Sequence, residues 1–191
     1  MSTSALLYLA LVVAIALERV GELLLTRRNL ARLKARGGKV VGDSHYPAMV
    51  AFHTSLLIAA PLEVFLLDRP FLPWLGWPAL AVVVVTMALR YWAITTLGDR
   101  WTTRVVVVPG EGPVTGGPYR FLRHPNYLAV IFEVAALPLV HSAWIVALLG
   151  TIGNALVLRT RIGVEEKALQ AAAPYFEELG DRSRFVPGGG A

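Results

Sequence analysis

The sequence contains no cysteine, and only 16% of its 191 residues are charged. Without cysteine the chain forms neither disulfides nor thiolate metal sites, and a cysteine nucleophile is excluded as well. Soluble globular domains carry about 25% charged residues, so the low charge content argues against a soluble enzyme. Hydrophobic residues make up 55% of the chain, and the mean hydropathy is +0.58. A chain with this much apolar surface is not intrinsically disordered.

The length of 191 residues predicts a single domain over residues 1–191. The 18 Lys and Arg residues exceed the 13 Asp and Glu residues, which gives a formal net charge of +5. These cations cluster beside hydrophobic segments, so a membrane surface explains them better than nucleic acid does. We therefore expect membrane lipids, and no nucleic acid, as partners.

Long apolar runs separate the charged clusters. A bilayer core of about 30 Å requires about 20 apolar helical residues. A signal peptide is a poor interpretation of the first run, because no Lys or Arg precedes it and no small-residue cleavage site follows. Residues 125–158 would extend about 50 Å as one helix, and Pro138 with His141 and Ser142 predicts a break there. We predict an all-α polytopic membrane protein with five spans, at about 4–25, 46–67, 71–89, 126–140 and 143–158.

The cations also predict the orientation in the membrane. They lie between spans one and two, between spans three and four, and after span five, whereas only Arg69 falls on the other side. By the positive-inside rule the N-terminus lies outside and the C-terminus in the cytoplasm. The polar segments 98–124 and 159–191 then share the cytoplasmic face, where we expect any chemistry.

A segment rich in glycine and proline, residues 109–118, precedes span four and cannot be helical. Pro125 favours an extended His124 and suits the first position of a helix. The free N–H groups of that first turn suit an anion. A plain loop-to-helix junction is the alternative, but His124, Asn126 and Tyr127 converge where a membrane helix begins. Polar groups in such places generally have a function, so we favour a binding site.

Arg161 and Glu165 are four residues apart and therefore share one helix face. The alternative is a surface ion pair worth under about 1 kcal/mol. Their position at the end of span five, on the same side as the glycine-rich segment, favours a functional role. We expect an interfacial helix to follow, through Leu169 to Leu179.

Charged residues also occur inside the spans. Glu18, Arg19 and Glu22 lie near the inner end of span one, and His45 and His53 lie at the start of span two. Such groups generally face a bundle interior, where they either bind a ligand or pin the helix through ion pairs. A lone acid in span four, Glu133, is expected to form hydrogen bonds within the bundle.

Motifs of soluble cofactor enzymes are missing from the sequence. No Gly-x-Gly-x-x-Gly turn between a strand and a helix, no Walker sequence and no His-Glu-x-x-His is present. Four scattered histidines without a fixed spacing do not predict a metal site.

The C-terminal half carries a specific combination of motifs: Gly117-Pro118-Tyr119-Arg120, Arg123-His124-Pro125-Asn126-Tyr127, Pro138-Leu139, Arg161 with Glu165-Glu166, Leu169, and Tyr175-Phe176. Over residues 89–180 this combination resembles the isoprenylcysteine carboxyl methyltransferase family, membrane-embedded enzymes that use S-adenosylmethionine. The N-terminal half adds Arg19-x-x-Glu22-Leu23, Arg28-Asn29, Gly37-Gly38, His45-Tyr46-Pro47, His53 and the run Arg90 to Arg104. These features resemble a bacterial branch associated with type III polyketide synthases, whose members O-methylate alkylpyrones or alkylresorcinols.

The resemblance implies roles for individual residues, within cofactor segments 98–127 and 159–180. Cofactor contacts are implied for Glu111, Gly112, Pro113, Val114, Tyr119, His124, Pro125, Asn126, Tyr127 and Glu165. Arg161 is implied to bind an anionic group of the substrate, which makes Arg161 and Glu165 the catalytic pair. We expect His45, His53 and Glu22 to contact the acceptor, and one of them to act as base if the acceptor is a phenol. Eukaryotic members carry Gln where Arg104 falls, so the role of Arg104 is left open.

These observations predict an integral membrane methyltransferase, in a bacterial inner membrane, that uses S-adenosylmethionine. Its acceptor is expected to be an enol, phenol or carboxylate of a lipophilic molecule that enters from the bilayer, foremost an alkylpyrone or alkylresorcinol. A prenylcysteine-like carboxylate and phospholipid N-methylation are the alternative acceptors. An NADPH-dependent sterol-type reductase and a non-catalytic membrane scaffold are the alternatives from other classes.

Overall fold

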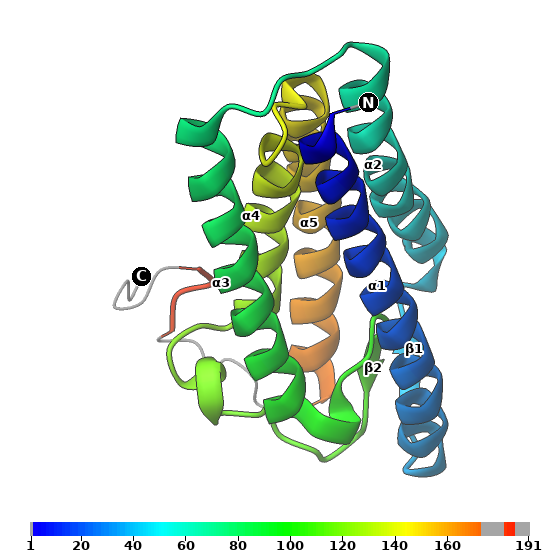
Figure 1. Ribbon diagram of the computed structural model, residues 1–191. Helices are drawn as coiled ribbons and strands as arrows, with labels where there is room; N and C mark the ends of the chain where they lie inside the picture. Colours follow the sequence, from blue (N-terminus) through cyan, green and yellow to red (C-terminus); the bar gives the residue numbers. More distant parts are fainter. Residues whose placement is uncertain (1, 173–181, 186–191) are drawn as a thin grey trace.

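The structure is a computed structural model that describes residues 2–172 and 182–185. It is a bundle of five α-helices (Figure 1), as predicted. Four are long and apolar enough to cross a membrane, and one is shorter. The helices are α1 (Thr3–Ala35), α2 (Tyr46–Leu66), α3 (Pro73–Leu97), the short α4 (Pro125–Leu139) and α5 (Trp144–Ala172).

The break predicted after Pro138 is a tight turn between α4 and α5. Ser142 adopts a left-handed backbone conformation with φ of 57°, and its hydroxyl donates a hydrogen bond to the carbonyl of Pro70. Nε2 of His141 lies 3.1 Å from the hydroxyl of Ser4. Both turn side chains are buried, so this turn is tied to α1 and to the α2–α3 connection. We call this end of the bundle, which also holds the N-terminus, the turn end (Figure 1, top).

Three helices are longer than predicted. α3 continues to Leu97, where the expected span ended at residue 89. α1 continues about ten residues beyond the expected span, to Ala35. α5 continues without a break to Ala172, so the separate interfacial helix predicted after span five is not formed by residues 159–172. Arg, Glu, Lys, Leu and Ala, which dominate that stretch, are good helix formers, and no proline interrupts them. The remainder of the expected helix, including Tyr175 and Phe176, lies outside the described residues.

A small sheet, not predicted from the sequence, lies at the opposite end of the bundle (Figure 1). β1 (Lys39–Val41) pairs antiparallel with β2 (Val105–Val107), with Val40 opposite Val106. Short 3₁₀ turns at Asp43–His45, Gly98–Arg100 and Gly117–Arg120 complete this region. We call it the loop end, because it holds the segment between α3 and α4.

The extension of α1 anchors the loop end. Asn29 is only 1% exposed, and its Nδ2 donates to the carbonyls of Gly98 at 3.0 Å and Trp101 at 2.8 Å. The hydroxyl of Thr26 accepts a hydrogen bond from the backbone N–H of Thr103 at 3.1 Å. The last turns of α1 thus fix the start of the segment that leads into the glycine-rich stretch.

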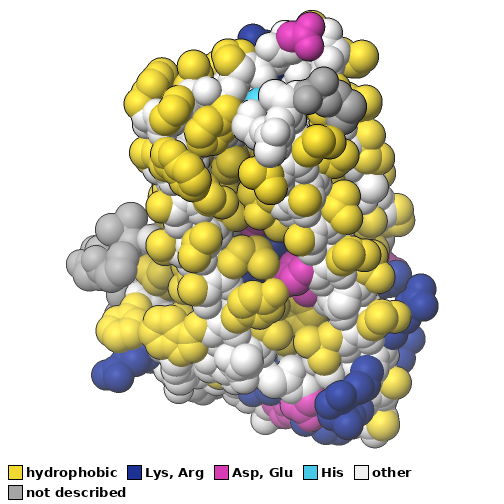
Figure 2. All heavy atoms as spheres, viewed as in Figure 1, with side chains coloured by type: hydrophobic (Ala, Val, Ile, Leu, Met, Phe, Trp, Pro, Cys, Tyr) yellow, Lys and Arg dark blue, Asp and Glu magenta, His cyan; other side chains and the backbone are white. Residues whose placement is uncertain are grey.

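Hydrophobic side chains cover most of the visible face of the bundle, while Lys and Arg gather mainly at the loop end (Figure 2). Leucine, valine and tryptophan side chains such as Leu7, Leu17, Trp74 and Val85 are more than 60% exposed. In water this surface would be unfavourable, so it is the surface of an integral membrane protein facing lipid tails.

Candidate active site

A cavity of about 370 Å³ extends from the loop end into the bundle. Ligand pockets in proteins commonly have volumes of about 300–1,000 Å³. Polar side chains line it near the loop end, and aliphatic side chains line a middle portion: Met49, Val50, Leu57, Val130 and Val134. The cavity therefore suits a molecule with a polar group attached to an apolar body.

Tyr127, Arg161 and Glu165 meet on the polar part of the cavity wall. Nε of Arg161 donates to the hydroxyl of Tyr127 at 3.0 Å, and that hydroxyl donates to a carboxylate oxygen of Glu165. Among the ion pairs of the described residues, none joins Arg161 directly to Glu165. Arg161 and Glu165 are thus connected through the hydroxyl of Tyr127, and we call these three hydrogen-bonded residues the relay. The spacing of Arg161 and Glu165 in the sequence could not reveal the tyrosine between them.

The second contact of Arg161 comes from the loop end. Its Nη2 donates to the carbonyl of Thr103 at 2.7 Å, and the hydroxyl of Thr103 lies 2.9 Å from that of Tyr46. The guanidinium of Arg104 lies 4.5 Å from the centre of the Tyr46 ring and forms an ion pair with Asp43 at 2.5 Å. Arg161 is 4% exposed, so these contacts hold its guanidinium in one orientation.

His124, at the start of α4, is buried and lines the cavity. Its Nε2 lies 3.0 Å from Oε1 of Glu166, the second of the paired acids, which the sequence did not single out. Arg184 pairs with the other oxygen of Glu166 at 2.5 Å. The backbone N–H groups of Arg123 and His124 donate to the carbonyls of Ser183 and Arg184, at 3.1 and 3.3 Å. Residues 182–185 are thereby fastened across the start of α4.

The glycine-rich segment contributes part of the cavity wall. Glu111, Pro113, Val114 and Tyr119 line the cavity. Gly112 is not among the lining residues that the structure describes, and its carbonyl accepts a 2.6 Å hydrogen bond from Arg100.

The turn that follows requires a glycine. Gly117 has φ of 53°, and a Cβ there would clash with the hydroxyl of Thr96 on α3. This close approach packs the 3₁₀ turn that carries Tyr119 directly against α3.

Of the three residues expected to contact the acceptor, two line the cavity and one does not. His53 and Glu22 line the cavity, whereas His45 is not among its described lining residues. His45 ends the 3₁₀ turn before α2, which places its ring against Gly42. Nδ1 of His53 lies 2.9 Å from the carbonyl of Met49, and its Nε2 lies 3.3 Å from Oδ1 of Asn154.

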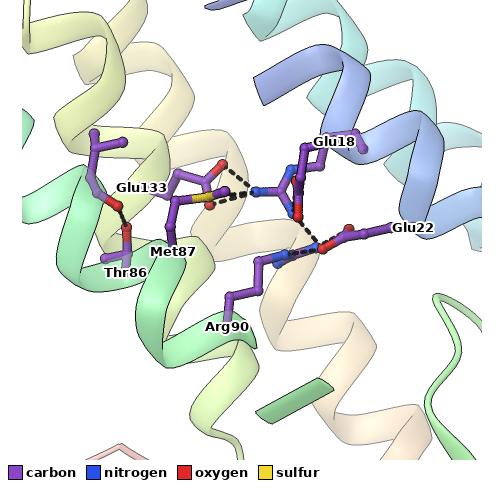
Figure 3. A network of polar contacts seen from close by, with 8 residues as sticks. Glu18, Glu22, Thr86, Met87, Arg90 and Glu133 are labelled. Atoms are coloured by element: carbon purple, nitrogen blue, oxygen red, sulfur yellow. Dashed lines mark hydrogen bonds and ion pairs between the residues drawn. The ribbon is translucent and has the colours of Figure 1, made fainter. Parts of the chain in front are cut away.

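Four charged side chains line the cavity farther from the loop end: Arg19, Glu22, Arg90 and Glu133. Figure 3 shows Glu22, Arg90 and Glu133 pointing toward one another from three helices. Nη2 of Arg19 donates to both oxygens of Glu133 at 2.9 and 3.0 Å. Arg90 donates to both oxygens of Glu22, from Nε and from Nη2. The sequence predicted hydrogen bonding of Glu133 but not its partner, nor any role for Arg90. We call these four residues the buried charge cluster.

The residues near the loop end fit S-adenosylmethionine, which carries a positive sulfonium, an amino acid group and hydroxyls. Oδ1 of Asn126 is buried and has no hydrogen-bond partner among the described residues. The first N–H groups of α4 lack helical partners and suit a carboxylate. Glu165 supplies a negative charge. Pro125, fully buried as the first residue of α4, shapes this turn without being among the described residues that line the cavity.

Comparison with known proteins gives one family model, two similar sequences and a similar structure. The family model described as "Isoprenylcysteine carboxyl methyltransferase (ICMT) family" matches residues 79–171. The uncharacterized protein YpbQ of Bacillus subtilis is 37% identical over 161 residues, which are 84% of this chain and 95% of that protein. An uncharacterized protein of Haemophilus influenzae is 27% identical over 159 residues, 82% of this chain and 91% of that protein.

The solved structure of the eukaryotic intramembrane Ras methyltransferase ICMT is similar to this fold, with a TM-score of 0.62. The similarity covers 91% of this chain but only 63% of that chain, at 20% sequence identity. At this identity the likeness concerns the fold. The matched segment, residues 79–171, contains most of the residues that line the cavity, among them Arg161 and Glu165. The chain therefore belongs to the isoprenylcysteine carboxyl methyltransferase family of membrane proteins.

Proposed function

We propose that the protein is a membrane-embedded O-methyltransferase that uses S-adenosylmethionine and acts on an acidic oxygen of a lipophilic acceptor, with alkylpyrones as the foremost substrate class. The observation that carries this proposal is the relay of Arg161, Tyr127 and Glu165 on the wall of a cavity whose middle is aliphatic.

When bound, S-adenosylmethionine supplies a methyl group on a positively charged sulfur, which an acceptor oxygen displaces in line. Such a displacement depends on alignment and on exclusion of water. Glu165 supplies a negative charge for a cationic ligand. Arg161 stays protonated at any working pH, and its planar guanidinium orients an anionic oxygen. Tyr127 fixes the two side chains relative to each other.

The hydrogen bonds inside the cavity favour an acceptor that is already anionic. A phenol with a pKa of about 10 needs a base. Both oxygens of Glu22 accept hydrogen bonds from Arg90, which leaves Glu22 poorly suited to take a proton. His53 lines the cavity, but its two ring nitrogens are engaged by the carbonyl of Met49 and by Oδ1 of Asn154. His45 is not among the described lining residues. A hydroxypyrone or a carboxylate needs no base, so the alkylpyrone is favoured over the alkylresorcinol.

The test is methyl transfer by the purified protein in nanodiscs, with S-adenosylmethionine labelled in its methyl group. Four acceptors are compared: a long-chain alkylpyrone, the matching alkylresorcinol, a farnesylated cysteine carboxylate and phosphatidylethanolamine. We expect label on the alkylpyrone at the highest kcat/KM. Label only on the farnesylcysteine or on the amine would overturn the substrate class. Binding of NADPH in place of S-adenosylmethionine would overturn the reaction itself.

A further inference from the structure

Burying charged side chains inside a membrane bundle costs free energy, because the charges lose their hydration. Glu22 and Arg90 are 6% and 7% exposed, and Glu133 is 9% exposed. They come from three helices, α1, α3 and α4 (Figure 3). Replacing a buried ion pair by well-packed apolar residues is often neutral or even stabilising. Stability alone therefore does not account for the cluster, and ionisable groups inside membrane bundles commonly contact ligands.

Arg90 has unused hydrogen-bonding capacity in this cluster. Its Nε and Nη2 are occupied by Glu22, whereas its Nη1 has no hydrogen-bond partner among the described residues. Arg90 lines the cavity, so Nη1 can donate to a molecule held there. A guanidinium only donates hydrogen bonds, and its partner must be an acceptor such as an oxygen.

The net charge of the cluster determines whether the ligand oxygen that Nη1 of Arg90 binds is anionic or neutral. Two arginines face two glutamates, and Glu18 places a third carboxylate 3.2 Å from Arg19. An anionic group added here would lie near an excess of negative charge, with little water to screen it. A neutral hydroxyl or carbonyl oxygen accepts from Nη1 without changing this balance.

The cluster and the relay lie on the same wall of the cavity. Glu133 and Tyr127 are both on α4, less than two helical turns apart, and Val130 between them lines the cavity as well. One headgroup can therefore face both sets of side chains while its alkyl chain lies against the aliphatic wall.

We propose that Arg90 forms a second acceptor subsite, in which Nη1 binds a neutral oxygen of the headgroup other than the oxygen that is methylated. This inference rests on the proposed function and narrows its substrate class to headgroups with two oxygens. An acceptor without the second oxygen leaves a buried donor unpaired, which is the situation in which protein sites discriminate most strongly.

The experiment measures binding and not turnover, so that it stands apart from the test of methyl transfer. The probes are pentadecylresorcinol and pentadecylphenol, each with the chain meta to a hydroxyl, which differ by one oxygen. Their affinities are measured in nanodiscs by competition with a fluorescent lipid. We expect the wild type to bind the resorcinol about 10-fold more tightly, the value of one hydrogen bond to a charged group.

Two variants remove the subsite in different ways. Arg90→Lys keeps a positive charge for Glu22 but lacks a second nitrogen, and the double variant Arg90→Gln/Glu22→Gln removes the pair without leaving a lone charge. Both should reduce the preference below about 2-fold. The affinity for S-adenosylmethionine should stay near that of the wild type, which also reports that each variant is folded.

The matched control is an ion pair outside the cavity, between buried Glu63 and half-buried Arg69 at 2.8 Å. Neither residue is among the described lining residues. Glu63→Gln/Arg69→Gln should keep the full preference. Equal binding of both probes by the wild type, or an unchanged preference in both Arg90 variants, would overturn the subsite. A preference that is present in a protein unable to methylate any acceptor would support the subsite and contradict only the proposed function.

Discussion

Arg161 makes two directional contacts, through Nε to Tyr127 and through Nη2 to the carbonyl of Thr103. A lysine would keep the charge, but all its donors lie on one nitrogen, so it cannot place donors at both the Nε and the Nη2 positions of the planar guanidinium. We expect Arg161→Lys to lower acceptor kcat/KM at least about 10-fold, while the affinity for S-adenosylmethionine changes less than about 2-fold. Turnover and isothermal titration in nanodiscs measure the two quantities. Near-wild-type turnover of Arg161→Lys would show that Arg161 has a purely structural role.

Glu165 accepts a hydrogen bond from Tyr127, and glutamine can accept the same bond. Glu165→Gln therefore isolates the effect of the negative charge. We expect it to weaken S-adenosylmethionine binding about 10-fold and to lower turnover as well. Tyr127→Phe is the control, because it breaks the relay and keeps the carboxylate: it should lower turnover with a smaller effect on cofactor affinity. Identical effects of the two variants would argue against a separate role for the charge.

At the scale of elements, the start of α4 depends on Glu166 in α5. This carboxylate forms a hydrogen bond with His124 and an ion pair with Arg184. A second ion pair, at 3.4 Å, joins it to Arg123. Removing it leaves these groups without their shared anion at the place where residues 182–185 cross the helix start. We expect Glu166→Ala to destabilise the protein by about 1–3 kcal/mol, seen as a lower Tm in detergent, and to weaken S-adenosylmethionine binding.

The neighbouring Lys167 is exposed, and Lys167→Ala is the control, with a Tm within about 1 °C of the wild type. An unchanged Tm in Glu166→Ala would show that the anion does not hold the start of α4.

The helices were predictable because apolar runs of membrane length leave few alternatives, and the turn at His141 because a proline and two polar residues interrupt such a run. The polar ends of α1 and α5 were not predictable as parts of the same helices, because their composition also suits interfacial segments. β1 and β2 have three residues each, too few to show a periodicity.

The partners of Glu133 and His124 were missed because Arg19 and Glu166 meet them only through the packing of distant helices. Backbone carbonyls such as that of Thr103 carry no signal in the sequence at all.

At the scale of the whole molecule, the distribution of Lys and Arg predicts that the loop end faces the cytoplasm. The absence of native cysteine makes this simple to test by thiol labelling of intact cells. A cysteine at Lys34, near the end of α1, should react only after the membrane is permeabilised. A cysteine at Leu67, in the exposed α2–α3 connection, should react from outside. The reverse pattern would invert the orientation.

The short helix α4 has a consequence for the surrounding lipid. Its 15 residues extend about 22 Å, whereas the hydrocarbon core is about 30 Å thick. Such a hydrophobic mismatch is relieved by local thinning of the bilayer, and Phe132, half exposed on α4, lies where the lipid must adapt. We therefore expect interfacial water and headgroups to come closer to the bilayer centre beside α4 than elsewhere around the protein. We therefore expect an amphipathic molecule to reach the depth of Tyr127 along this thinned rim while its polar end stays hydrated. The polar end would lose its water only when it enters the cavity.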